Sequence, residues 1–164
     1  MLAGGLSQDI NEILYGERLL ALKKNDGGLR SIAIGYKIRI LAAKCANMYA
    51  TNKLAAQLAR TQLGVGVPGG AEAAIHALRR YAEKLPKDHI SVKLNFSNAL
   101  NTLRRDEMLD AIWKELPEIL NFVHATYNGS TQLQFDEFTI TSEEGSQQGD
   151  NLSSSDVDQF TIRT

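Results

Sequence analysis

The sequence predicts an α+β fold, and two observations lead to this class. Stretches in which apolar residues recur with the period of a helix alternate along the chain with short runs in which every second residue is apolar. A mixture of helices and half-buried strands in this order favours an α/β or α+β domain over a helical bundle. The 164 residues suffice for one modest hydrophobic core.

The N-terminal part is expected to hold a short helix, a hairpin and a long helix. These elements cover 8–15, 18–23 with 29–35, and 37–58. Ser7 can cap the first helix, and the turn signal Asn25-Asp26-Gly27-Gly28 joins the two strands. Helical spacing predicts the long helix. Its apolar positions are Ile38, Leu41, Ala42, Cys45, Met48 and Tyr49.

The remaining chain is expected to continue the alternation. A glycine-rich break over 64–70 precedes a helix over 71–84, which Pro86 ends. The further elements are a half-buried strand over 90–96, helices over 102–116 and 118–127 interrupted by Pro117, strands over 131–135 and 138–141, and a polar loop from Glu143.

The charge is unevenly distributed. Residues 1–82 hold 11 Lys/Arg against 5 Asp/Glu, whereas residues 83–164 hold 7 against 14, although the whole chain has a net charge of −1. A basic N-terminal half suits contact with a polyphosphate or a nucleic-acid backbone. A solvated helix face explains the same charge equally well.

The composition argues against secretion and against a membrane partner. No apolar run approaches the ~20 residues that span a bilayer, and the start of the chain lacks a basic and apolar signal. Cys45 is the only cysteine, so an internal disulfide is impossible and a reducing compartment fits. We expect an intracellular protein of the nucleus or cytoplasm.

The sequence gives little support for a dinucleotide-binding site or for a histidine metal site. Gly64-x-Gly66-x-x-Gly69 fits the dinucleotide fingerprint formally, but the end of a helix precedes it and Pro68 removes an amide donor, so a turn between helices is favoured. The three histidines, His76, His89 and His124, have no cysteine or carboxylate at metal-ligand spacing.

Three segments become informative when they are taken together. They are Leu20–Gly35, Val92–Asn101 and Ser142–Asp150, and Gln62–Tyr81 lies between the first two. Over roughly 18–152, in this order and at this spacing, the chain resembles the reverse transcriptase (RNA-directed DNA polymerase) of a non-LTR retrotransposon.

This resemblance implies part of the fingers and palm of a right-hand polymerase, with the thumb and part of the palm sheet absent. The implied regions are an N-terminal helical lead-in over 1–17, a fingers-like region over 18–88, a partial palm over 89–152 and a diverged polar tail over 153–164. The implied reaction is RNA-templated DNA synthesis, in which two Mg²⁺ ions stabilise the attacking and leaving oxygens. The implied partners are an RNA template, a DNA primer and a deoxynucleoside triphosphate.

The resemblance also assigns nucleotide-binding positions. Lys24 and Arg30 match hairpin positions that grip the triphosphate, a role that cations on a closing hairpin suit. Gln148 and Gly149 match the motif that lies against the nucleotide and the template strand. Leu100 stands where the family usually has an aromatic residue beneath the sugar. The full set is Lys24, Arg30, Asn98, Leu100, Gln148 and Gly149.

The catalytic position departs from the family. Asn95 occupies the place of a metal-binding aspartate, and its neutral amide is a poor ligand for Mg²⁺. Losing one such electrostatic contact costs on the order of 10²–10³ in rate. The family pattern also fails after Leu152, and no Tyr-x-Asp-Asp motif occurs in the sequence. We therefore expect an impaired enzyme that binds no Mg²⁺ productively.

A second hypothesis belongs to another class of function. The chain could be a non-catalytic nucleic-acid-binding or regulatory domain derived from a reverse transcriptase. Its basis is the excess of positive charge in the N-terminal half and the retention of Lys23, Lys24 and Arg30 on the hairpin.

Overall fold

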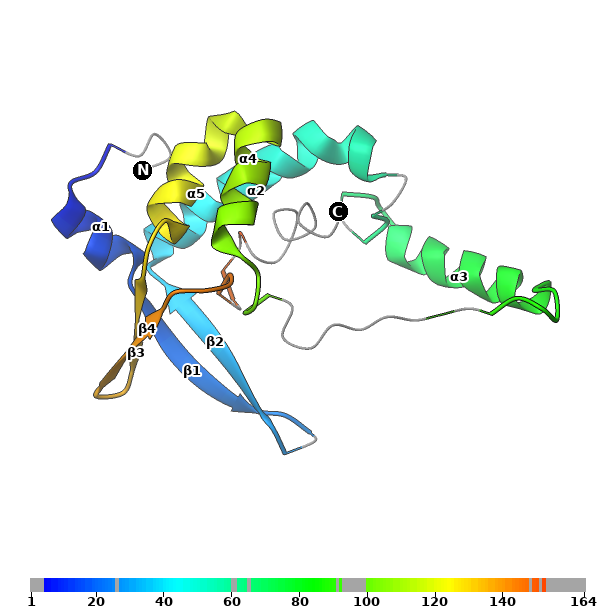
Figure 1. The fold of residues 1–164 in the computed structure, drawn as a ribbon, viewed down its shortest axis with the longest axis horizontal. Helices are drawn as coiled ribbons and strands as arrows, with labels where there is room; N and C mark the ends of the chain where they lie inside the picture. The colour runs from blue at the N-terminus through cyan, green and yellow to red at the C-terminus, as the bar shows by residue number, and fades with distance from the viewer. Residues whose placement is uncertain are drawn as a thin grey trace. The chain divides into compact units, whose positions relative to one another are not determined.

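The computed structural model describes residues 5–25, 27–59, 62–64, 66–90, 92, 100–147, 149–150 and 152. The chain divides into two compact units, one formed by Met1–Ala50 with Asn98–Thr164 and the other by Thr51–Ser97. Figure 1 shows the course of the chain. None of the described helices is both long and apolar enough to cross a membrane.

The described elements are those of an α+β protein, which confirms the predicted class. In chain order they are α1 (Gln8–Tyr15), β1 (Glu17–Lys23), β2 (Leu29–Gly35), α2 (Lys37–Leu58), α3 (Gly70–Glu83), α4 (Arg105–Glu115), the 3-10 turn η1 (Pro117–Ile119), α5 (Leu120–Tyr127), β3 (Thr131–Phe135) and β4 (Phe138–Ser142).

The first unit contains a mixed four-stranded sheet with the strand order β2-β1-β3-β4. β1 and β2 form an antiparallel hairpin from the pair Glu17 and Gly35 to the pair Lys23 and Leu29. β3 and β4 form the second hairpin. The two hairpins join where β1 pairs in parallel with β3, with Glu17 opposite Leu133. The start of β1 therefore lies at the centre of the sheet, whereas β2 is an outer strand of the described sheet.

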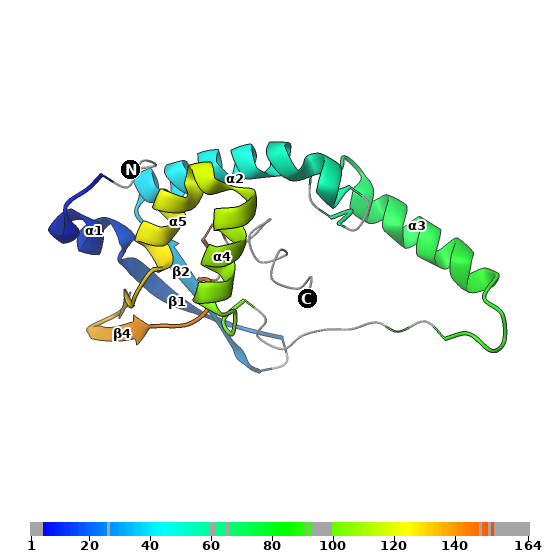
Figure 2. The same cartoon turned by 45° about the horizontal axis from the view of Figure 1, so that its top comes forward.

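The core of this unit lies between the sheet and its helices. α4 and α5 pack on each other, as both views show (Figures 1 and 2). Their largest buried side chains include Met108, Ile112 and Phe122, each at most 1% exposed. On the sheet, Ala33 and Leu133 are buried side chains of one face. Burial of this apolar surface is the main force that holds the hairpin bases in place.

The long helix is found over the predicted residues, but the apolar positions that indicated it do not form its buried face. Ile38, Leu41 and Met48 are 59%, 62% and 65% exposed. The buried face of α2 in this unit carries alanines instead, and they are Ala43, Ala46 and Ala50. α2 is apolar on more than one side, so spacing could not select the buried side.

Two boundaries after residue 100 also differ from the prediction. α4 begins at Arg105 instead of 102, because the amide of Gly145 donates to the Leu103 carbonyl at 3.0 Å and Arg104 is extended. Pro117 opens a 3-10 turn before α5. The strand expected over 90–96 falls mostly outside the described residues, and its two described members, Ile90 and Val92, lie outside any strand.

In the second unit, the glycine-rich segment joins α2 to α3, which confirms a turn between two helices. The Gly70 amide donates to the Val67 carbonyl at 2.9 Å. A Cβ on Gly70 would lie 2.0 Å from the Leu63 carbonyl oxygen, so glycine is required there for close packing of the turn.

Candidate nucleic-acid interface

The tip of the β1–β2 hairpin carries exposed cations. Lys23, Lys24 and Arg30 are all exposed, and together with Leu22 and Asn25 they line an open hollow. The turn is closed by a hydrogen bond from the Lys24 amide to the Gly28 carbonyl at 2.7 Å. Three cations around one hollow form a positive surface that suits a phosphate-bearing ligand.

The third informative segment lies against the same hairpin. A Cβ on Gly149 would approach the Ala33 carbonyl oxygen to 2.6 Å and Cγ2 of Ile32 to 2.9 Å, and the backbone there has φ +107°. Only glycine tolerates both conditions. Ile32 and Arg30 are two residues apart on β2, so their side chains point to the same face of the sheet.

The end of the second segment meets the third segment through backbone contacts. The Ser146 amide donates to the Leu100 carbonyl at 2.8 Å. Gly145 has φ +68°, and a Cβ there would lie 2.3 Å from the Asn101 carbonyl oxygen. Three of the predicted site residues, Asn95, Asn98 and Gln148, lie outside the described residues.

A partly open cavity of about 420 Å³ lies between the sheet and residues 142–147. The first hairpin contributes Leu19, Ser31 and Ala33 to its wall, and the second segment contributes Asn101. Residues 142–147 supply most of the remaining wall. The volume lies in the range of small-molecule sites.

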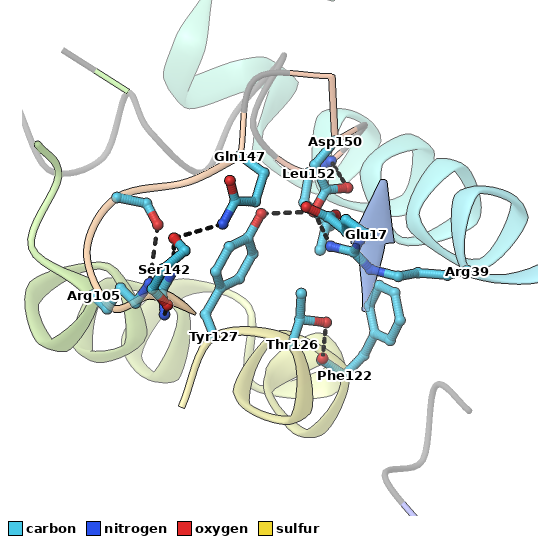
Figure 3. A network of polar contacts seen from close by, with 11 residues as sticks. Glu17, Arg39, Arg105, Phe122, Thr126, Tyr127, Ser142, Gln147, Asp150 and Leu152 are labelled. Carbon is cyan, nitrogen blue, oxygen red and sulfur yellow. Dashed lines mark hydrogen bonds and ion pairs between the residues drawn. The ribbon is translucent and has the colours of Figure 1, made fainter. Parts of the chain in front are cut away.

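A buried ion-pair network fixes the end of the third segment. The Arg39 guanidinium on α2 contacts the carboxylates of Glu17 and Asp150, the latter at 2.5 Å, and these side chains are at most 3% exposed. The Tyr127 hydroxyl donates to the same Asp150 oxygen at 2.6 Å. The Leu152 amide donates to the other Asp150 oxygen at 3.2 Å. Figure 3 shows Asp150 between Tyr127 and Arg39.

The electrostatics of this network keep Tyr127 neutral. Burial, followed by the charge of Asp150, raises the pKa of the Tyr127 hydroxyl well above its ordinary value. Burial also raises the pKa of Tyr15, whose ring lies 6.0 Å below the Arg39 guanidinium. Both tyrosines therefore stay protonated at neutral pH, and Tyr127 remains a hydrogen-bond donor.

Arg105 fastens the beginning of the third segment. Its Nε donates to the Gly145 carbonyl at 3.0 Å. Its Nη1 donates to the carbonyls of Gly129 and Ser142 at 2.5 and 3.2 Å. Its Nη2 donates to the Ser142 hydroxyl at 3.1 Å and to the Glu144 carbonyl at 3.4 Å. All five guanidinium donors are used. Burial lowers the pKa of Arg105, although nearby Tyr127 and acidic groups oppose this.

Sequence reasoning missed the residues that build this arrangement, namely Glu17, Arg39, Arg105, Tyr127 and Asp150. Arg39 shares a helical face with the buried alanines of α2, but the spacing of apolar residues did not identify that face, so no signal in the sequence marked Arg39. A charged residue on a buried face requires a partner.

The described residues contain no group of three His, Cys, Asp or Glu side chains placed to hold a metal ion. Asp150 is the last residue of the third segment, but its oxygens accept from Arg39, Tyr127 and the Leu152 amide. This carboxylate is therefore already satisfied within the protein.

Comparisons with known proteins do not assign a family. No protein-family model matches the chain, and no curated protein matches it.

Proposed function

We propose that this chain is a reverse transcriptase-like fragment of a non-LTR retroelement that keeps a nucleic-acid-contacting fingers surface and has lost nucleotidyl transfer. One observation carries the proposal. The hairpin, the end of the second segment and the third segment meet in one unit, although Leu100 and Gly149 follow the hairpin by many residues. These are the segments on which the resemblance rests.

The chemistry of the assembled surface supports a polyanionic ligand. Lys24 and Arg30 stand at the exposed tip, and Gly149 lies beside Ile32 on the face that carries Arg30. A nucleic-acid backbone or a triphosphate would contact these cations. The cavity is lined by Ser31 and Ala33 and therefore lies on the other face of β2, so it is not part of this surface. Phosphate contacts of this kind supply affinity without sequence preference.

Loss of catalysis rests on Asn95. In the family that the chain resembles, an aspartate at this position binds Mg²⁺. A neutral amide with a single carbonyl oxygen does not replace a carboxylate where two divalent ions concentrate positive charge. We therefore expect this chain to bind nucleic acid without catalysing nucleotidyl transfer.

We expect the purified chain to incorporate no nucleotide into a DNA primer annealed to an RNA template, with either Mg²⁺ or Mn²⁺. Incorporation would be followed as extension of a labelled primer, with an active reverse transcriptase as the positive control. Asn95→Asp should also remain inactive, because the sequence contains no Tyr-x-Asp-Asp carboxylates. RNA-dependent extension by the unaltered chain would contradict the loss of catalysis.

We expect the chain to bind an RNA–DNA hybrid with an affinity that falls as salt rises, as fluorescence anisotropy would measure. Lys24→Ala and Arg30→Ala should each weaken binding. Each should also reduce the salt slope, which is the slope of the logarithm of affinity against the logarithm of salt concentration, by about one unit. Lys114→Ala, which removes an exposed lysine from α4, is the matched control and should change little. Binding that ignores salt and both hairpin substitutions would refute this interface.

A further inference from the structure

Arg39 stands between the hairpin and the third segment. It lies in the first turn of α2, four residues after Gly35 ends β2. A Cβ on Gly35 would lie 2.8 Å from Nη1 of Arg39, so glycine leaves space for the guanidinium. Gly35 is the cross-strand partner of Glu17. The guanidinium thus lies beside Gly35, at the base of the hairpin, where it contacts the Glu17 carboxylate.

The other half of the guanidinium holds the third segment. Nη2 of Arg39 lies 2.5 Å from Oδ2 of Asp150, and both side chains are 3% exposed. Asp150 immediately follows Gly149, which already contacts β2. Tyr127 adds a donor from α5 to the same carboxylate. Asp150 is therefore held from two helices, and its position determines how closely Gly149 approaches the hairpin.

The energetics of this cluster favour a role in geometry. One guanidinium faces two buried carboxylates, so the desolvation cost is large and the charges do not balance. Apolar residues of similar volume often give equal or greater stability than a buried ion pair. A two-sided guanidinium, however, fixes two carboxylates at a defined separation, because its donors form a rigid planar fork.

We infer that Arg39 is a positioning residue that couples the β1–β2 hairpin to the third segment through Glu17 and Asp150. It sets the spacing between the basic hairpin and Gly149 without touching the ligand. This inference rests on the proposed function for its effect on binding, but the coupling itself is a property of the free protein.

Asp150→Asn tests the coupling with little change of shape. The substitution removes one negative charge, so electrostatics alone would tighten binding to an RNA–DNA hybrid. Loss of positioning should instead weaken binding between about 2-fold and about 30-fold, the range of coupling through packed networks. The salt slope should stay unchanged, because no phosphate contact is lost. Arg39→Lys, a point charge that cannot bridge both carboxylates, should weaken binding in the same direction.

Hydrogen exchange provides a readout that does not need the ligand. Asp150→Asn should speed amide exchange in 142–150 and also in the strands 17–23 and 29–35, which are far from residue 150 in sequence. It should leave α4 protected. Asp106→Asn is the matched control, since Asp106 also lies 2.5 Å from an arginine nitrogen but is 65% exposed. Met108→Ala, a core variant, should raise exchange in α4 without changing the affinity of the folded protein.

The possible outcomes separate the two proposals. If the unaltered chain fails to bind the hybrid, the proposed function is refuted, whereas exchange in the hairpin still decides the coupling. If the chain binds and Asp150→Asn binds equally or more tightly, Arg39 is not a positioning residue. Faster exchange confined to 142–150 would likewise overturn the inference.

Discussion

Replacing Arg105 with methionine is expected to lower the free energy of unfolding by about 3–5 kcal/mol, one of the largest effects for a single residue here. Methionine fills a similar volume but donates no hydrogen bond. The carbonyls of Gly129, Ser142, Glu144 and Gly145 would lose a common donor in a partly buried place. Urea denaturation followed by circular dichroism would measure the loss.

Arg104 supplies the control for this substitution. It is the preceding residue, its side chain is 67% exposed, and among the described residues its guanidinium pairs with the exposed Asp106 and Glu107. Arg104→Met should therefore leave the unfolding transition almost unchanged. Arg105→Lys should fall between the two, since an ammonium has three donors and no fork. Equal destabilisation by Arg104→Met and Arg105→Met would contradict the importance of the five hydrogen bonds.

These adjacent arginines show where prediction from sequence stops. Arg104 is the N-cap and Arg105 the first residue of the same helix, and local spacing does not distinguish them. Only the long-range approach of 142–145 makes Arg105 a buried donor and leaves Arg104 in solvent. The same long-range approach explains why α4 begins later than predicted, because the Leu103 carbonyl accepts a hydrogen bond from the Gly145 amide.

Local signals were sufficient for the hairpins. The Asn-Asp-Gly-Gly turn and alternating flanks predicted β1 and β2, and both strands were found where expected, with β1 one residue longer at Glu17. The parallel pairing of β1 with β3 was not predictable in this way. It joins Glu17 to Leu133 and depends on the whole intervening chain.

The candidate site shows the same division between local and long-range information. The turn signal predicted a hairpin that carries Lys24 near its tip and Arg30 on its returning arm, and both side chains are exposed there. The partners of Asp150 could not be inferred, since they come from α2 and α5. The nucleotide-contacting roles of Lys24 and Arg30 remain predictions.

Gly145→Ala is expected to destabilise the first unit for two separate reasons. Gly145 has φ +68°, a left-handed conformation that costs a residue with a Cβ about 1–2 kcal/mol. The new Cβ would also lie 2.3 Å from the Asn101 carbonyl oxygen, 2.4 Å from its carbon and 2.5 Å from its Cα. Backbone cannot yield as a flexible side chain does, so overpacking should add about 1–3 kcal/mol.

Gly27→Ala isolates the first of these terms. Gly27 lies in the same unit with φ +85°, but nothing lies within 4 Å of a Cβ built there. Its substitution should cost only the conformational part, about 1–2 kcal/mol. The difference between the two unfolding free energies then measures how closely Asn101 is pressed against the third segment. Equal losses at both glycines would mean that 100–101 and 145 separate freely, and the close approach of the second and third segments would be refuted.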